Sequence, residues 1–371
     1  MNDRNILVIG GGIGGLTAAI ALRQKGHRVT VIEKDPDWSV YGVGIIQQSN
    51  VIRAMAELGL LDDYLSAGVP FDNIAIHTPD GTKVAEIPAP RLAENYPANV
   101  GIGRPALHKV LGDRTKASGA EIRLGVVADA IDDSGDRVHV SFSDGKTEEF
   151  DIVVGADGVY SDTRQKIMPD AEKPEFTGQS VWRYNFKRPD DLNALHVYNG
   201  PTGIGLVPIS KERMYMYVTT PEPDKPVYAT AGMAQTMREK LSAAPPQIQK
   251  LAAEITDDEG VVYRPLEQMM LYGAWHSGRV VLLGDAVHAT TPHLGQGAGM
   301  AIEDSLVLAD ELSRHDTPEA AFQAYRARRF DRCKYIVEKS LAICHGQLGK
   351  GPPVDNAEAT HEMFAIVSQP I

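Results

Sequence analysis

Two polar features follow each other within residues 279–304, RVVLLGDAVHATTPHLGQGAGMAIED. An apolar run of strand character ends in Gly284-Asp285, and Pro292 then precedes a glycine cluster that opens a helix. An acid at the end of a strand is suited to accept hydrogen bonds from sugar hydroxyls. The start of a helix presents N–H groups and positive charge to the electron-rich edge of a bound ring. The stretch therefore predicts a flavin nucleotide, FAD, as the cofactor.

A second glycine motif lies near the N-terminus. Gly10, Gly12 and Gly15 form the pattern GxGxxG after an expected strand at residues 5–9, and Glu33 ends the next strand. The first glycine permits a tight turn, the second lets the backbone approach a pyrophosphate, and the third lets the helix pack closely on the strand. Glu33 stands where a ribose hydroxyl is held, and its charge disfavours the 2′-phosphate of NADP at this site. The segment therefore predicts a dinucleotide site.

A third motif, IVVGADGVYSDTR, spans residues 152–164. A buried strand ends in a turn that contains Asp157, and Ser161 then begins a short helix. Alone, this pattern is typical of any connection from a strand to a helix. Its position between the two glycine motifs makes Asp157 a candidate for the cofactor site.

The elements that would position these motifs indicate an α/β fold. The strand–helix–strand order at residues 5–33 predicts a parallel sheet, whereas residues 178–220 carry the alternation of antiparallel strands. We predict a Rossmann-like FAD-binding domain interrupted by a mixed β-sheet substrate domain, with a C-terminal helix and a loosely ordered tail. The predicted segments are 1–72, 98–175 and 265–316 for the FAD-binding domain, 73–97 and 176–264 for the substrate domain, 317–346 for the helix and 347–371 for the tail.

Composition excludes several classes of protein. The formal net charge is −12 and no lysine- or arginine-rich run exists, so we expect no nucleic-acid partner. No apolar run of about 18 residues is present, which predicts no membrane insertion. Cys333 and Cys344 are the only cysteines, and they lack the close spacing of a redox dithiol. We expect a cytoplasmic protein, a monomer or a homodimer, with no metal site.

Together the three motifs resemble a known family in their order and spacing. The chain looks like a single-component, FAD-dependent aromatic hydroxylase, the group of para-hydroxybenzoate, salicylate and 6-hydroxynicotinate monooxygenases. The resemblance covers residues 5–345 and is far more specific for the family than for the substrate. It implies that NADH or NADPH reduces the flavin, that O2 adds at C4a as a hydroperoxide, and that one oxygen atom passes to a small electron-rich aromatic ring.

The resemblance also implies a set of cofactor-binding residues. Arg104 would approach the ribityl-pyrophosphate region, Ala128 the adenine, and Asp285 the ribityl chain. The start of the last Gly-rich helix would face the flavin N1–C2 edge, where negative charge develops on reduction. The full predicted set is Gly10, Gly12, Ile13, Gly14, Gly15, Glu33, Lys34, Ile45, Arg104, Ala128, Asp157, Gly284, Asp285, Gly297, Ala298 and Gly299.

The sequence identifies the substrate-binding residues less clearly than the cofactor-binding residues. The resemblance places Pro292 at the substrate side of the flavin ring, while Ile46 replaces a histidine of the 6-hydroxynicotinate type and argues against that substrate. A base that deprotonates a phenolic substrate would raise its reactivity. The candidates for catalysis are Pro292, His293, His196 and Tyr217, and those for substrate binding are Arg183, Tyr198 and Tyr215. His288 is interpreted as a structural residue.

Two alternative functions stay open at this point. One is a flavoenzyme of the same fold that catalyses epoxidation, Baeyer–Villiger oxidation or reduction. The other is a non-catalytic FAD-binding protein that responds to redox state. Acceleration of NAD(P)H oxidation by an aromatic compound would separate a hydroxylase from both.

Overall fold

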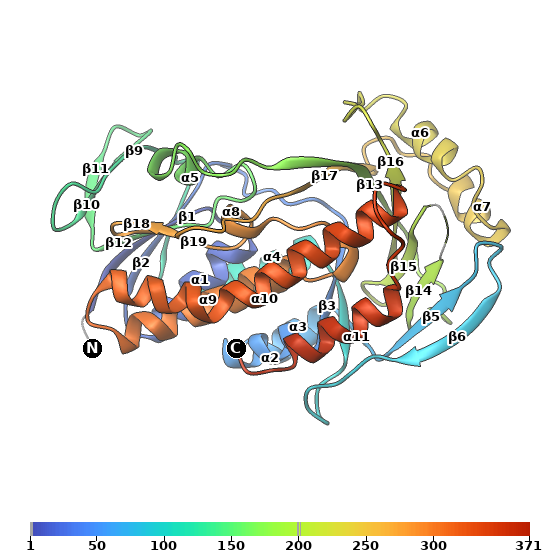
Figure 1. Ribbon diagram of the computed structural model, residues 1–371, viewed down its shortest axis with the longest axis horizontal. Helices are drawn as coiled ribbons and strands as arrows, with labels where there is room; N and C mark the ends of the chain where they lie inside the picture. The colour runs from blue at the N-terminus through green and yellow to red at the C-terminus, as the bar shows by residue number, and fades with distance from the viewer. Residues whose placement is uncertain (1–2, 199, 201) are drawn as a thin grey trace.

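The computed structural model describes residues 3–198, 200 and 202–371 and contains two large sheets joined by long helices (Figure 1). The first sheet has the strand order β18-β19-β12-β1-β2-β8, and its strands are parallel except for the edge strand β18. These strands are β1 (Asn5–Ile9), β2 (Arg28–Glu33), β8 (Glu121–Leu124), β12 (Ile152–Gly155), β18 (His276–Ser277) and β19 (Val280–Leu282). This sheet confirms the predicted α/β class.

The second sheet is mixed and has seven strands in the order β17-β13-β16-β15-β14-β5-β6. It lies to the right in Figure 1, and within the described residues β14 and β5 form its one parallel pair. The strands are β5 (Asn73–His77), β6 (Lys83–Pro88), β13 (Glu175–Lys187), β14 (Leu195–Tyr198), β15 (Ile204–Pro208), β16 (Arg213–Pro221) and β17 (Val262–Gln268). Two segments distant in sequence, 73–88 and 175–268, therefore build one sheet. We call it the substrate sheet.

The two faces of the substrate sheet differ in what covers them. Side chains alternate along a strand, so Met214 and Met216 face one side and Tyr215 and Tyr217 the other. The methionine face packs against α6 (Met233–Lys240) and α7 (Pro246–Ala253) in one apolar cluster. The tyrosine face instead meets a three-stranded sheet of the cofactor domain. That small sheet has the order β3-β7-β4 and consists of β3 (Gly44–Gln48), β4 (Val69–Phe71) and β7 (Asn99–Gly103).

Helices surround the parallel sheet and connect the two halves. A further three-stranded sheet lies at the far left of Figure 1 and comprises β9 (Ala128–Asp132), β10 (Val138–Phe142) and β11 (Thr147–Phe150). The remaining elements are α1 (Ile13–Gln24), α2 (Ser49–Glu57), α3 (Leu61–Ala67), α4 (Arg104–Ala117), α5 (Asp162–Ile167), α8 (Asp285–His288), a 3-10 turn (Pro292–Leu294), α9 (Gly297–Arg314), α10 (Pro318–Gln347) and α11 (Asn356–Val367). The long helix α10 reaches from the parallel sheet to the substrate sheet (Figure 1).

The C-terminal tail is more ordered than its sequence predicted. Asp355 caps α11 by accepting hydrogen bonds from the N–H groups of Ala357 and Glu358. The helix buries Met363, Phe364 and other apolar residues in the main core. The polar composition of residues 352–371 obscured this apolar face, so the prediction of a loosely ordered tail was wrong.

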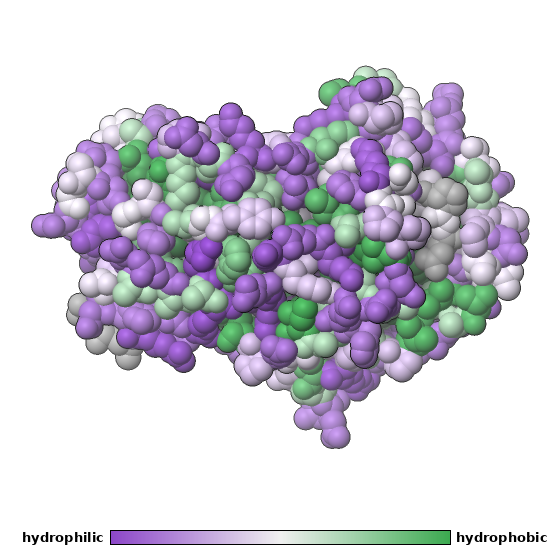
Figure 2. Space-filling model, viewed as in Figure 1, coloured by the Kyte–Doolittle hydropathy of each residue, from purple (hydrophilic) through white to green (hydrophobic). Residues whose placement is uncertain are grey.

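The surface is mostly polar in the view of Figure 2, with apolar groups gathered toward the right, where β5 and β6 lie in Figure 1. Val84 and Ile87 on the edge strand β6 are among the exposed apolar residues. Among the helices within the described residues, none combines the length and the apolar character needed to cross a membrane.

Candidate active site

The first glycine turn forms an open cradle at the start of α1. Gly10 has φ +110°, and a Cβ atom there would lie 2.4 Å from the carbonyl oxygen of Ala156, so only glycine is compatible with the turn. A Cβ on Gly15 would lie 1.8 Å from the Gly10 carbonyl oxygen, which explains the close approach of helix and turn. A Cβ on Gly12 would meet nothing within 4 Å. The free space beside Gly12 and the helix N-terminus fit a pyrophosphate.

Side chains from β2, from the loop after β2 and from α4 hold this turn. Glu33 accepts hydrogen bonds from the N–H groups of Gly11, at 2.8 Å, and Asp35, at 2.9 Å. The carbonyl oxygen of Gly11 accepts from Trp38 Nε1 at 2.9 Å and from His108 Nε2 at 3.0 Å. Sequence reasoning missed Trp38 and His108, because their contacts with Gly11 depend on how the loop after β2 packs against α4.

Asp285 and Arg104 lie close enough for the charge of each to shift the pKa of the other. The Asp285 side chain is accessible to water yet lies deep in the protein, where desolvation raises its pKa and the charges of His288 and Arg104 partly offset that effect. Desolvation likewise lowers the pKa of Arg104, and the neighbouring Tyr215 and Asp285 oppose this shift. Asp285 and Arg104 are thus surrounded by protein but still accessible to a ligand. The carboxylate can accept hydrogen bonds from ribityl hydroxyl groups, and the guanidinium can bind a phosphate.

The N-terminus of α9 provides the predicted N–H donors. The first intrahelical bond runs from Met300 to Gln296 at 2.8 Å, so the N–H groups of Gly297, Ala298 and Gly299 have no acceptor within the helix. Gly299 has a further, packing role, because its Cβ would lie 2.9 Å from Val51 on α2.

A buried charge network supports α9 and the Gly284-Asp285 turn from behind. Asp304 accepts hydrogen bonds from the Gly284 N–H at 3.0 Å, from His288 at 2.7 Å and from Arg329 at 2.8 Å. Arg329 also donates to Glu303 at 2.7 Å, and all four side chains are buried. His288 is therefore part of the buried network, in agreement with its interpretation as a structural residue.

This network also contains a group with metal-ligand atoms. Ligand atoms of His288, Asp304 and Cys333 lie within 4.8 Å of one another. Arg329 donates to Asp304 and lies 3.7 Å from Cys333 Sγ. The guanidinium thus supplies the positive charge that this group needs, and a cation would compete with it.

Asp157, one of the predicted cofactor residues, has hydrogen-bond partners within the protein. Asp157 accepts from the hydroxyl of Ser161 at 2.5 Å and from the N–H and hydroxyl of Thr163, both at 2.9 Å. It therefore caps α5, although it directly follows the Gly155 end of β12. The others occupy strand ends or helix starts: Ile13 and Gly14 in the first turn of α1, Lys34 exposed after β2, Ile45 in β3, and Ala128 at the start of β9.

The substrate sheet brings Arg183, Tyr215 and Tyr217 close to Arg104. Register pairs Arg183 on β13 with Tyr217 on β16, so both point to the tyrosine face. The Tyr215 ring covers Gly44, whose Cβ would lie 2.3 Å from Tyr215 Cδ1, and Tyr217 covers Gly205. Desolvation raises the pKa of Tyr217 above its ordinary value and that of Tyr215 to about 12. Both phenols keep their protons at neutral pH, so Tyr217 is placed to donate a hydrogen bond rather than to act as a base.

His196 and Tyr198 lie on the other face of the sheet. His196 pairs with Leu206 on the methionine face, where its Nδ1 lies 3.2 Å from His77 Nε2, and His77 stacks on Tyr198. The predicted roles of His196 in catalysis and of Tyr198 in substrate binding stay predictions, and this placement on the face opposite Arg183 and Tyr217 does not favour them. The register of β14 against β15, which local sequence does not specify, turns both side chains away.

Pro292 and His293 lie in the 3-10 turn before α9. Pro292 is exposed, whereas His293 Nδ1 lies 2.9 Å from the Thr291 hydroxyl and Nε2 lies 3.1 Å from Gln347 Oε1. Desolvation lowers the pKa of His293 to about 4. The imidazole is therefore neutral at physiological pH and hydrogen-bonded at both nitrogens.

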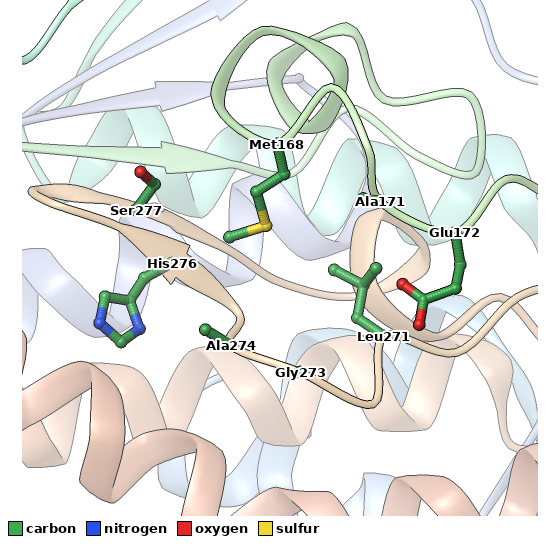
Figure 3. Close-up of a pocket in the computed structure, with 8 residues that line it drawn as sticks. All are labelled: Met168, Ala171, Glu172, Leu271, Gly273, Ala274, His276 and Ser277. Atoms are coloured by element: carbon green, nitrogen blue, oxygen red, sulfur yellow. The ribbon is translucent and has the colours of Figure 1, made fainter.

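A separate cavity of about 350 Å³ lies between the segment after α5 and the loop before β18 (Figure 3). Its walls include Met168, Glu172, Leu271 and His276. None of the predicted site residues lines it.

Comparison with known proteins agrees with this geometry. The FAD binding domain family matches residues 3–340. The chain is 32% identical to 2-heptyl-3-hydroxy-4(1H)-quinolone synthase of Pseudomonas aeruginosa, over 93% of this chain and 89% of that one. It is also 32% identical to 6-hydroxynicotinate 3-monooxygenase of Pseudomonas fluorescens, over 89% of each chain.

A solved structure gives the same result. The crystal structure of Klebsiella pneumoniae HpxO complexed with FAD and uric acid matches with a TM-score of 0.85 and 26% identity, over 98% of this chain and 92% of that one. The resemblance and the cofactor predicted from the sequence are thereby confirmed. This chain belongs to the FAD binding domain family and is an FAD-dependent monooxygenase of the aromatic hydroxylase group.

Proposed function

We propose that this monooxygenase hydroxylates a small electron-rich aromatic or heteroaromatic ring that binds between α9 and the tyrosine face of the substrate sheet. The observation that carries the proposal is the convergence of Asp285 and Arg104 from the cofactor domain with Arg183, Tyr215 and Tyr217 from the substrate sheet. One set has the chemistry to hold a flavin nucleotide, and the other the chemistry to hold a polar ring.

The cofactor domain would bind and orient FAD through its backbone. The turn at Gly12 and the N-terminus of α1 would hold the pyrophosphate, and Glu33 and Asp285 would accept hydrogen bonds from hydroxyl groups. The free N–H groups at the start of α9 would stabilise negative charge on the flavin ring. When bound, FAD supplies the redox chemistry: it accepts a hydride from NADH or NADPH and activates O2 for transfer of one oxygen atom.

The substrate sheet would position the ring and exclude water. Tyr217 would donate a hydrogen bond, and Pro292 would contact the substrate side of the flavin. The apolar residues Phe71, Val207 and Ile209 pack beside Tyr215 and close one wall against water. None of the predicted candidates is well placed as a base for a phenolic substrate. His196 lies on the other face, Tyr217 retains its proton, and His293 has a pKa of about 4 with both nitrogens hydrogen-bonded.

Anaerobic stopped-flow measurement of flavin reduction tests this proposal. We expect reduction by NADH or NADPH to be slow alone and to accelerate at least about 10-fold when the matching phenol, pyridine or quinoline is present. With ¹⁸O2, the product would contain one labelled oxygen atom. A broad panel of aromatics that neither accelerates reduction nor yields labelled product would refute a hydroxylase.

We also propose a cellular location and an oligomeric state for this protein. Cys333 and Cys344, which are free, buried thiols, support a location in the reducing cytoplasm. The chain is proposed to be a monomer or a homodimer, which light scattering would decide.

A further inference from the structure

The loop between β2 and β3 holds a tryptophan in an uncommon backbone conformation. Trp38 has φ +50°, in the left-handed region that bulky residues rarely occupy, so this conformation costs free energy. Asp35 fixes the backbone around it by accepting hydrogen bonds from the N–H groups of Asp37 at 3.0 Å and Ser39 at 2.8 Å. The strained backbone accompanies a specific placement of the indole ring, between the glycine turn and α4.

Two glycines leave space for this ring. A Cβ on Gly11 would lie 2.7 Å from Trp38 Nε1, and a Cβ on Gly112 would lie 3.2 Å from Trp38 Cη2. Gly112 lies in the interior of α4, where glycine is destabilising relative to alanine. His108, one turn earlier on this helix, meets the indole edge-on at a centroid distance of 4.7 Å. The sequence of α4 thus accommodates the indole beside the glycine turn at a cost to helix stability.

The indole and the imidazole donate to the same carbonyl group. Trp38 Nε1 and His108 Nε2 lie 2.9 Å and 3.0 Å from the Gly11 carbonyl oxygen. A carbonyl oxygen can only accept, so the buried His108 carries a hydrogen on Nε2. One donor is enough to satisfy a buried carbonyl group, whereas two donors from separate elements also fix its direction.

The direction of the Gly11 carbonyl determines the direction of the next N–H group. In a planar trans peptide the C=O and N–H bonds point in opposite directions. Gly11 is buried and its carbonyl points toward Trp38 and His108, so the Gly12 N–H points toward the exposed side of the turn. Among the residues that the structure describes, this N–H has no acceptor, and a Cβ on Gly12 would meet nothing within 4 Å. Hydrogen bonds to the carbonyl also polarise the peptide group and strengthen its N–H as a donor.

We propose that Trp38 and His108 are positioning residues for FAD, which hold the Gly11–Gly12 peptide so that the Gly12 N–H donates to the pyrophosphate. This inference rests on the proposed binding of the pyrophosphate at the glycine turn. Neither side chain needs to touch the cofactor, because both act through the peptide. A donor that already points at its acceptor lowers the cost of ordering the site when the cofactor binds.

Titration of the FAD-free protein with FAD, followed by flavin fluorescence, tests this inference. Trp38→Phe keeps an aromatic ring beside α4 and removes the Nε1 donor. His108→Leu removes the second donor, whereas His108→Gln keeps an N–H group close to the position of Nε2. We expect each loss of one donor to weaken FAD binding about 3- to 10-fold, and the double variant Trp38→Phe/His108→Leu to weaken it about 30-fold. His108→Gln should bind FAD within about 2-fold of the wild-type affinity, because the donor is restored.

Trp182→Phe is the matched control. It removes an indole hydrogen bond of 3.0 Å, which Trp182 donates to the Thr220 hydroxyl group within the apolar cluster on the methionine face of the substrate sheet. Because this bond lies far from the glycine turn in the fold, the variant should keep its FAD affinity.

A spectroscopic signature separates positioning from a general loss of structure. The chain contains three Gly-Gly peptides, at residues 10–11, 11–12 and 14–15, so glycine labelled with ¹³C at the carbonyl and with ¹⁵N gives three signals in an HNCO spectrum. In the FAD-free protein we expect the Gly12 ¹⁵N signal to move upfield in both Trp38→Phe and His108→Leu, because its peptide carbonyl loses a donor. The Gly15 signal should stay in place, and it should do so in His108→Gln as well.

Two kinds of result would overturn the inference. One is full FAD affinity in both Trp38→Phe and His108→Leu, or equal losses in His108→Gln and His108→Leu. The other is an unmoved Gly12 signal in variants that bind FAD more weakly, which would assign the weaker binding to a general loss of structure.

Gly12→Ala separates this inference from the proposed position of the pyrophosphate. If Gly12→Ala weakens FAD binding and the two donor variants do not, the turn binds the pyrophosphate without help from Trp38 and His108. If Gly12→Ala leaves FAD affinity unchanged, the proposed position fails and the inference fails with it.

Discussion

The glycine turn at Gly10–Gly15 and the face of the substrate sheet around Arg183 and Tyr217 define binding surfaces in different ways. The turn presents backbone N–H groups, and its shape follows from positions where a Cβ atom would clash. The sheet presents side chains, and its chemistry follows from which face each strand turns toward the cofactor domain. The binding surface of the cofactor half thus depends on backbone conformation. The binding surface of the substrate half depends on the register of its strands. Variants that change one property and leave the other intact can test this distinction.

We expect the largest loss of stability from a variant of the buried charge network that supports α9 and the Gly284-Asp285 turn. Arg329→Met leaves the buried carboxylates of Asp304 and Glu303 without one of their partners, which typically costs about 3–5 kcal/mol of unfolding free energy. Because Asp304 also holds the Gly284 N–H, we expect faster hydrogen exchange in α9 and β19 than in β13 and β16. Urea unfolding and hydrogen exchange measure the two effects.

Lys109→Met is the control, since Lys109 forms an exposed pair with Asp113 on α4. Exposed pairs contribute little, so a loss below about 0.5 kcal/mol is expected. Similar losses in the two variants would show that the buried network does not support the cofactor half.

The second prediction separates the two roles of glycine within one turn. Gly10→Ala forces a residue with φ +110° and a clash with Ala156, so we expect the FAD-free protein to lose about 3 kcal/mol of stability. Gly12→Ala meets nothing within 4 Å, so the FAD-free protein should keep its stability. Its added methyl group would occupy the open cradle, and FAD affinity should fall at least about 10-fold. Thermal unfolding of the FAD-free proteins and flavin fluorescence titration measure these outcomes. Unchanged FAD affinity in Gly12→Ala would place the pyrophosphate elsewhere.

The third prediction concerns the contribution of one side chain, Asp285, to FAD binding in the cofactor half. Asp285→Ala removes a deep carboxylate beside Arg104. Hydrogen bonds to a charged group contribute about 1.5–3 kcal/mol, so FAD affinity should fall by about 10- to 100-fold and the purified variant should be depleted of flavin. The ratio of flavin to protein absorbance gives the occupancy, with Asp113→Ala as an exposed control. Full occupancy in Asp285→Ala would remove Asp285 from the cofactor site.

The difference between local backbone conformation and strand register also explains which site residues could be predicted from the sequence. Gly10, Gly12, Gly15, Glu33 and Asp285 lie at strand ends and helix starts, and local spacing places such positions without knowledge of the whole fold. Trp38 and His108 escaped prediction because their contacts with Gly11 join segments about 30 to 100 residues apart.

The substrate sheet could not be oriented in this way. Tyr215 and Tyr217 alternate with Met214 and Met216, and only the packing of α6 and α7 on the methionine side decides which face is open. His196 was assigned to the site by residue type alone, but the pairing of β14 with β15 turns it to the covered face. One usable signal was present: the apolar run Met214, Met216 and Val218 predicts the core side of β16, and therefore the tyrosines as the open side.

The smallest expected effect tests register in the substrate half. Gly205 lies opposite Tyr217, and a Cβ on Gly205 would lie 2.1 Å from Tyr217 Cε1. Gly205→Ala should therefore displace the Tyr217 ring without touching the cofactor domain. We expect FAD occupancy to stay unchanged and the KM for the aromatic substrate to rise about 3- to 10-fold, as expected for a misplaced contact that positions the ring. Gly135→Ala, in an exposed turn, is the control. An unchanged KM in Gly205→Ala would show that Tyr217 does not contact the substrate, and a loss of FAD would show that the two halves cannot be varied independently.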